Sequence, residues 1–144
     1  MTETITSTSA SLYARIQHFY AWQMQALDRG DFEVYASTFT TDGSFQHSPT
    51  LPAAQGRAGI VEALNDFNQR FKDDPVQRRH WFNHVALEEQ PDGTIKSTVY
   101  ALVVTVRPGG KPEIAPSCVV HDVIVRDGEE FYLRSRRVTH DQLF

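Results

Sequence analysis

Residues 78–87, RRHWFNHVAL, mark the point at which the hydrophobic pattern of this 144-residue chain changes from helical to alternating. Before this segment, apolar residues recur every three or four positions, and after it they recur every second position. As a β-strand, the segment would place His80 and His84 on one face, because side chains four positions apart in a strand point the same way. Two imidazoles that reach one cavity are suited to proton transfer near neutral pH.

The residues before this segment predict a helical N-terminal part. Apolar residues at helical spacing over residues 12–27 indicate a first amphipathic helix. Gly30 then provides a stop, and Asp31 provides the N-cap of a second, short helix that extends to Tyr35.

The rest of the chain predicts one more helix and five strands. A short strand over residues 44–48 and a loop over residues 49–55 precede a third helix, which apolar residues indicate over residues 60–71. Turn signals then separate four alternating runs, approximately residues 79–89, 95–107, 114–126 and 130–139. Short connections between these runs favour an antiparallel meander.

Helices followed by a meander predict an α+β domain. We expect a cone-shaped, curved antiparallel sheet wrapped around the N-terminal helices, in the order α-α-β-α-β-β-β-β, with a ligand pocket at its open end. This single domain is expected over residues 11–140, with a disordered tail over residues 1–10 and a C-terminal tail over residues 141–144.

Composition limits the partners and the compartment. A formal net charge of -4 and scattered arginines provide no basic face, so nucleic acid is not an expected partner. The chain contains no apolar run long enough for a membrane span and no signal-peptide pattern at its N-terminus. A lone Cys118 excludes an internal disulfide, and it fits a cytoplasmic protein in which this residue is small, buried and apolar.

The element order, with residues 22–45 (WQMQALDRGDFEVYASTFTTDGSF), RRHWFNHVAL and residues 121–141 (HDVIVRDGEEFYLRSRRVTHD), resembles the nuclear transport factor two-like superfamily. The nearest similarity is to its SnoaL-like and scytalone-dehydratase-like branch. Within that branch, YALVVTVRPGG and RSRRVTHD resemble small accessory proteins of bacterial aromatic polyketide pathways. The resemblance implies a cyclase, a dehydratase or an isomerase.

The resemblance also implies a catalytic pair. His80 matches the position of a catalytic histidine in scytalone dehydratase-like proteins, and Asp28 matches an aspartate that orients it. The second catalytic histidine of that family has no counterpart, because Tyr100, Leu102 and Val104 occupy the next strand. This difference argues against scytalone-type syn dehydration.

Other residues are candidates for the second proton transfer. The resemblance places His47, or equally Ser48, where ketosteroid isomerase-like relatives carry a proton-abstracting carboxylate. Tyr100 and Tyr35 are candidate hydroxyl donors to a developing enolate. The alternative for both tyrosines is a place in the core with the hydroxyl at its rim.

Asp122 has two competing interpretations. SnoaL-like cyclases use an aspartate on a late strand as general acid/base, and Asp122 matches that position. Alternatively, Asp122 forms an ion pair with Arg136 or Arg137 on the neighbouring strand. Strand alternation allows only one of Asp122 and His121 to face the pocket.

Aromatic residues are the candidate walls of the pocket, and His84 is a candidate ligand contact or subunit contact rather than a base. The expected walls come from Phe19, Phe39, Phe45, Phe67, Trp81 and Phe82. His80, His84 and Asp122 could converge on a metal, but no helical HExxH or facial-triad spacing supports one. We expect no cofactor, because GxGxxG, P-loop and nucleophile-elbow motifs are absent from the sequence.

These observations predict a cofactor-independent acid/base enzyme that acts on a hydrophobic, carbonyl-bearing aromatic polyketide intermediate. Two alternatives remain open: a noncatalytic carrier of such molecules, and a scaffold subunit like the β subunit of ring-hydroxylating dioxygenases. A homodimer is expected in any case, through an outer sheet face that includes Trp81, Val123 and Val125.

Overall fold

The computed structural model describes residues 7–143, which form three helices, six strands and a final 3₁₀ turn. The elements are α1 (Ala10–Asp28), α2 (Phe32–Ser37), β1 (Phe39–Gln46), β2 (Ala54–Gln55), α3 (Gly56–Gln69), β3 (Gln77–Glu89), β4 (Ile95–Val106), β5 (Glu113–Asp127), β6 (Glu130–His140) and η1 (Asp141–Leu143). Residues 1–6 of the expected N-terminal tail lie outside the described residues, and Ala10 already belongs to α1.

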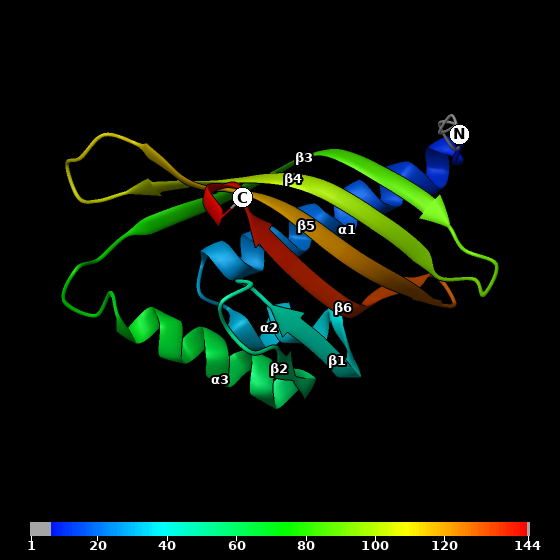
Figure 1. Ribbon diagram of the computed structural model, residues 1–144, viewed down its shortest axis with the longest axis horizontal. Helices are drawn as coiled ribbons and strands as arrows, with labels where there is room; N and C mark the ends of the chain where they lie inside the picture. The colour runs from blue at the N-terminus through cyan, green and yellow to red at the C-terminus, as the bar shows by residue number, and fades with distance from the viewer. Residues whose placement is uncertain (1–6, 144) are drawn as a thin grey trace.

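The predicted meander is confirmed, but the sheet is mixed rather than fully antiparallel. The strands lie in the order β2-β1-β6-β5-β4-β3, and β3 to β6 pair as antiparallel neighbours. β1 pairs with β6 in parallel, because the chain passes through α3 and the whole meander before β6 returns to its side. Figure 1 shows α1 crossing behind the long strands, while α2, α3, β1 and β2 gather along one edge of the sheet.

β1 begins five residues before the predicted strand, because Asp42-Gly43 lies within the strand instead of ending a helical unit. The pairing of β1 with β6 shifts between Phe39 and Ser44. A Cβ atom at Gly43 would lie 3.0 Å from the Cβ of Phe39 and 3.1 Å from the carbonyl oxygen of Leu133. Glycine therefore permits the close backbone approach at this irregularity.

The predicted stripe of α1 packs against the concave face of the sheet. Ser9 caps the helix by accepting a hydrogen bond from the backbone N–H of Leu12 at 3.1 Å. Ile16 and Tyr20, one turn apart, are 0% and 2% exposed. Burial of large apolar and aromatic side chains on one helix face is the main favourable contribution to this packing.

A β-bulge in β3 reverses the alternation of faces that the sequence predicts. The pairing of β3 with β4 shifts between Asn83 and Ala86, and His84 has a φ of 54°. The side-chain oxygen of Asn83 accepts a hydrogen bond from the backbone N–H of His84 at 2.8 Å, which supports this local conformation. Phe82 therefore faces inward, His84 faces outward, and Val85 faces inward again.

None of the helices in the described part of the chain is long and apolar enough to cross a membrane.

Candidate active site

The predicted pair of Asp28 and His80 is in direct contact. Asp28 is the last residue of α1, and His80 lies near the start of β3 on its inward face. The Nδ1 atom of His80 lies 2.6 Å from Oδ1 of Asp28, and the backbone N–H of His80 donates to Oδ2 of the same carboxylate at 3.2 Å. The carboxylate is therefore held at two points by one residue.

This contact fixes the chemistry of the imidazole. A carboxylate oxygen only accepts hydrogen bonds, so Nδ1 of His80 donates to Asp28, and in the neutral imidazole Nε2 carries the lone pair. The side chain of Asp28 is 7% exposed, whereas that of His80 is 21% exposed. His80 can therefore exchange a proton through Nε2 while its orienting partner stays covered.

Arg78 is a neighbour of His80 that the sequence reasoning missed. It lies two residues earlier on the same strand face, and its guanidinium lies 4.2 Å from the ring centre of Phe71 and 5.1 Å from that of Phe67. No carboxylate of the described residues forms an ion pair with it, and burial, with a contribution from Arg107, lowers its pKa. The alternation of Arg78 with His80 was the signal that could have identified it.

His47 lies just after β1 and packs against α3. Its ring lies 5.8 Å from the ring of Phe67 and 5.6 Å from the ring of Phe45, measured between centres. Burial lowers the pKa of His47, and the nearby His140 and Arg70 lower it further. His47 is therefore neutral at neutral pH and available as a base.

An open circuit of side-chain contacts begins and ends on β3, on either side of His80. Arg78 contacts Phe67, which contacts His47 and then Phe45, so the circuit passes from β3 through α3 to β1. It continues through the inner residues Tyr35, Arg136 and Phe82 and returns to β3. The circuit therefore links residues of β3, α3, β1, α2 and β6, and His80 lies on β3 between its two ends, Arg78 and Phe82.

The inner part of the circuit is a buried polar network. Asp122 and Arg136 are 1% and 2% exposed, and Nε and Nη2 of Arg136 donate to the two carboxylate oxygens at 2.9 and 2.8 Å. The hydroxyl of Tyr20 donates to Asp122 at 2.7 Å and lies 2.6 Å from the hydroxyl of Ser97. The structure thus shows the ion pair of Asp122 with Arg136, the alternative that the sequence left open.

Burial and neighbouring charges keep Arg136 and the two phenols of this network protonated. Burial alone lowers the pKa of Arg136, but the adjacent Asp122 outweighs burial and raises it above its ordinary value. Burial also raises the pKa of Tyr20 and Tyr35, so both phenols remain protonated. Burial raises the pKa of Cys118 to about 11, in agreement with the prediction that it is a buried apolar residue.

Two predicted ligand contacts lie on the wrong face of the sheet. Tyr100 is 58% exposed on the outer face, where its ring lies 5.9 Å from that of His84. The prediction that His84 shares the face of His80 is wrong because the bulge between them adds one residue. Trp81, one of the proposed wall residues, also faces outward and is 65% exposed.

The remaining predicted contacts face inward. Tyr35 and Phe45 are buried, and Phe82 is partly buried between Tyr20 and Arg136. No cluster of three or more His, Cys, Asp or Glu side chains in residues 7–143 is arranged to hold a metal ion.

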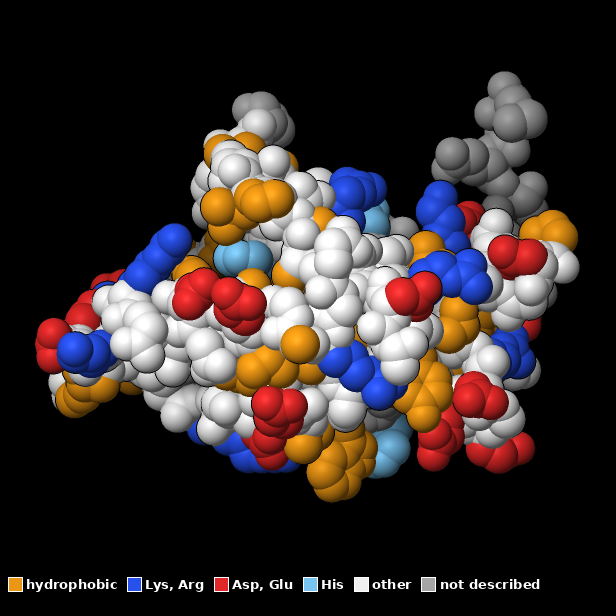
Figure 2. All heavy atoms as spheres, turned by 90° about the horizontal axis from the view of Figure 1, so that it is seen from below, with side chains coloured by type: hydrophobic (Ala, Val, Ile, Leu, Met, Phe, Trp, Pro, Cys, Tyr) orange, Lys and Arg blue, Asp and Glu red, His pale blue; other side chains and the backbone are white. Residues whose placement is uncertain are grey.

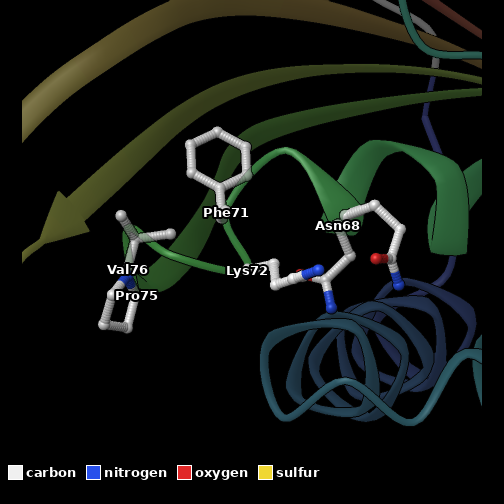
Figure 3. Close-up of a pocket in the computed structure, with 6 residues that line it drawn as sticks. Asn68, Phe71, Lys72, Pro75 and Val76 are labelled. Atoms are coloured by element: carbon white, nitrogen blue, oxygen red, sulfur yellow. The ribbon is translucent and has the colours of Figure 1, made fainter.

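The surface near Arg78 is hollowed in two adjacent places. The first hollow, of about 400 Å³, lies where α3 ends and the chain turns toward β3 (Figure 3); its lining residues are Asn68, Gln69, Phe71, Lys72, Pro75 and Val76. The second, of about 380 Å³, shares Pro75 and Val76 with the first and extends to the β4–β5 turn. His80 lines neither hollow. Figure 2 also shows a hollow around a histidine side chain, on a face where charges of both signs are interspersed with hydrophobic side chains.

The fold and the dyad together define an α+β protein of the nuclear transport factor two-like class. The SnoaL-like domain family matches residues 8–137, and the chain belongs to this family. No curated protein matches the chain.

Three solved structures show how similar the relatives are. ActVI-ORFA from Streptomyces coelicolor is 56% identical, with a TM-score of 0.86 over 91% of this chain and 98% of that chain. A Catenulispora acidiphila protein in complex with S-DNPA is 46% identical, with a TM-score of 0.86 over 94% of this chain and 97% of that chain. Aln2 from a Streptomyces species is 33% identical, with a TM-score of 0.88 over 96% of both chains.

Proposed function

We propose that this protein is a cofactor-independent acid/base enzyme that cyclises, dehydrates or isomerises a carbonyl-bearing aromatic polyketide intermediate in the cytoplasm. The observation that carries the proposal is the 2.6 Å contact between Asp28 and His80, which leaves Nε2 of His80 free to take a proton. The complex of the Catenulispora acidiphila relative with S-DNPA supports a small-molecule ligand for this domain.

In this proposal, His80 removes a proton beside a carbonyl group, and Asp28 is the positioning residue that holds its tautomer. Arg78 has no counter-ion among the described residues, so its charge can balance an enolate or carboxylate of the substrate. His47, neutral because of its burial, handles the second proton. Asp122 supports the site through Arg136 instead of exchanging a proton itself.

Deuterium exchange tests the proposal with a matched control on the same strand. A panel of cyclic and open-chain aromatic polyketide ketones would be incubated in D₂O with wild type, His80→Gln or His84→Gln, and deuterium incorporation and product would be followed by mass spectrometry. We expect His80→Gln to reduce the rate at least ~100-fold, the worth of a positioned general base. His84→Gln should leave it unchanged, because that side chain lies on the outer face. Binding without exchange by wild type would contradict catalysis and favour a carrier.

We further propose that two copies pair through the outer sheet face. Trp81 pairs with Leu102 across β3 and β4, and Tyr100 lies two residues away on the same face. These three side chains are 65%, 41% and 58% exposed. Exposed aromatic residues on neighbouring strands are typical of a protein interface.

A further inference from the structure

The buried network contains N–H and O–H groups that find no acceptor among the described residues. Arg136 has five N–H groups, of which two donate to Asp122 and one, on Nη1, donates to the hydroxyl of Tyr35 at 3.1 Å. Two N–H groups of Arg136 are therefore unmatched among residues 7–143. The hydroxyl of Tyr35 accepts from Arg136, and its own proton has no acceptor in the same part of the chain.

Tyr20 differs from Tyr35 in this respect. Its hydroxyl donates to Asp122 and is hydrogen-bonded to Ser97, so it is satisfied in both directions. Buried donors normally find an acceptor, because an unmatched donor loses the hydrogen bonds that water gave it. The unmatched N–H and O–H groups of Arg136 and Tyr35 are therefore available to an oxygen that does not belong to residues 7–143.

The position of these donors connects them to the proposed site. The guanidinium of Arg136 lies 5.2 Å from the ring centre of Phe82, which faces inward two residues after His80. The ring of Tyr35 contacts Phe45, which contacts His47. The donors thus belong to the same circuit of contacts as His47, and this circuit reaches β3 on both sides of His80.

We propose that Arg136 and Tyr35 bind an oxygen atom of the ligand, a carbonyl or phenolic oxygen on the ring farthest from His80. This inference rests on the proposed function, because it assigns the inner end of that site. Asp122 and Tyr20 hold the guanidinium in place, and the ligand oxygen accepts from Arg136 and from the protonated hydroxyl of Tyr35.

The spacing of the site defines the class of ligand. His80 and Phe82 are two residues apart on β3, which corresponds to about 7 Å along the strand. The guanidinium of Arg136 lies against the ring of Phe82, so it lies farther along β3 than His80. A carbonyl oxygen is much closer than this to the hydrogen on its own α-carbon. We infer that the bound oxygen is remote from the carbon that reacts at His80, as it would be in a ligand of two or more fused aromatic rings.

The inference is tested with two molecules of the same shape. Calorimetric titrations of wild type, Tyr35→Phe and Tyr132→Phe would compare 1-naphthol with 1-methylnaphthalene, which has a methyl group in place of the hydroxyl group. We expect wild type to prefer 1-naphthol, and Tyr35→Phe to reduce that preference by about threefold to tenfold, the worth of one hydrogen bond. Tyr132→Phe should keep the preference, because its hydroxyl donates to Glu130 at the surface, outside the proposed site.

Several results would overturn the inference. One is that wild type binds the two molecules equally well or binds neither. Another is that Tyr35→Phe keeps the wild-type preference for 1-naphthol. The last result would mean that internal water satisfies the donors. The two experiments distinguish this inference from the proposed function. If His80→Gln loses exchange but wild type shows no preference for 1-naphthol, this inference alone is refuted. If wild type prefers 1-naphthol but His80→Gln keeps the wild-type exchange rate, the proposed function alone is refuted.

Discussion

Removal of the Asp122 carboxylate is expected to destabilise the protein strongly, because it leaves the charge of Arg136 buried without a partner. Arg136 is 2% exposed and donates both of its ionic hydrogen bonds to Asp122. Breaking one side of a buried ion pair costs about 3–5 kcal/mol. Small domains have a total stability of about 5–15 kcal/mol, so Asp122→Ala should lose a large fraction of it.

Urea unfolding followed by circular dichroism measures this effect. With a slope of about 2 kcal/mol per molar urea, a loss of about 3–5 kcal/mol lowers the midpoint by roughly 2 M. Asp74→Ala is the matched control, because it removes an ion pair with Arg107 whose side chains are about half exposed. The control should leave the midpoint nearly unchanged.

A double variant separates the charge from the volume of the side chains. Asp122→Leu with Arg136→Met removes both charges and fills the space with apolar groups, so it should be less destabilised than Asp122→Ala alone. A midpoint of Asp122→Ala within experimental error of wild type would refute the reasoning. The reasoning would also be refuted if the loss of stability in the double variant equalled the sum of the losses in Asp122→Leu and Arg136→Met measured separately. Two residues that form an ion pair should not have additive effects.

Three further results are expected. Asp28→Asn should give a deuterium-exchange rate between those of wild type and His80→Gln, with an altered pH profile, because it disturbs the tautomer of His80 but leaves the imidazole in place. An exchange rate equal to that of wild type would contradict the positioning role of Asp28. Burial lowers the pKa of His47 in the folded protein, so the stability that neutral His47 contributes is fully present above the unfolded pKa of about 6.5 and is lost as the pH falls. Between about pH 7 and pH 5, the urea midpoint of His47→Gln should therefore decrease less than that of wild type. Trp81→Glu should convert a wild-type dimer into a monomer by light scattering, and a monomeric wild type would refute pairing through this face.

The elements that local chemistry determines were predictable from the sequence. The apolar stripe of α1, the stop at Gly30 and the N-cap at Asp31 follow from short-range rules, and the structure confirms them. The turn signals of the meander likewise separate β3, β4, β5 and β6 at the predicted places. The start of β1 and the two-residue β2 were not predictable in this way, because each depends on a partner strand elsewhere in the chain.

The contact of Asp28 with His80 was predictable only through the resemblance. These residues are 52 positions apart, and no local rule brings a helix end to a strand over that separation. The motifs of the superfamily supplied the pairing, and the structure confirms the contact. Its catalytic role stays a prediction that the exchange experiment tests.

Two one-residue irregularities decide which side chains reach the interior. In β3 the bulge near His84 removes that histidine from the inner face, and strict alternation would have kept it there. In β6 the pairing with β5 shifts between Leu133 and Ser135, so the buried residues change from Phe131 and Leu133 to Arg136. Without that shift Arg137 would face inward, and the choice between Arg136 and Arg137 that the sequence left open would be reversed.

Neither irregularity is marked by glycine or proline, the usual signals of a break in a strand. Each follows from the pairing with a neighbouring strand, which sequence alternation alone does not contain. The acid/base chemistry of this site therefore depends on sheet register as much as on residue type. A relative with the same histidines and arginines but without these bulges would place His84 inside and Arg136 outside, and it would lose the inner donors that we assign to the ligand oxygen.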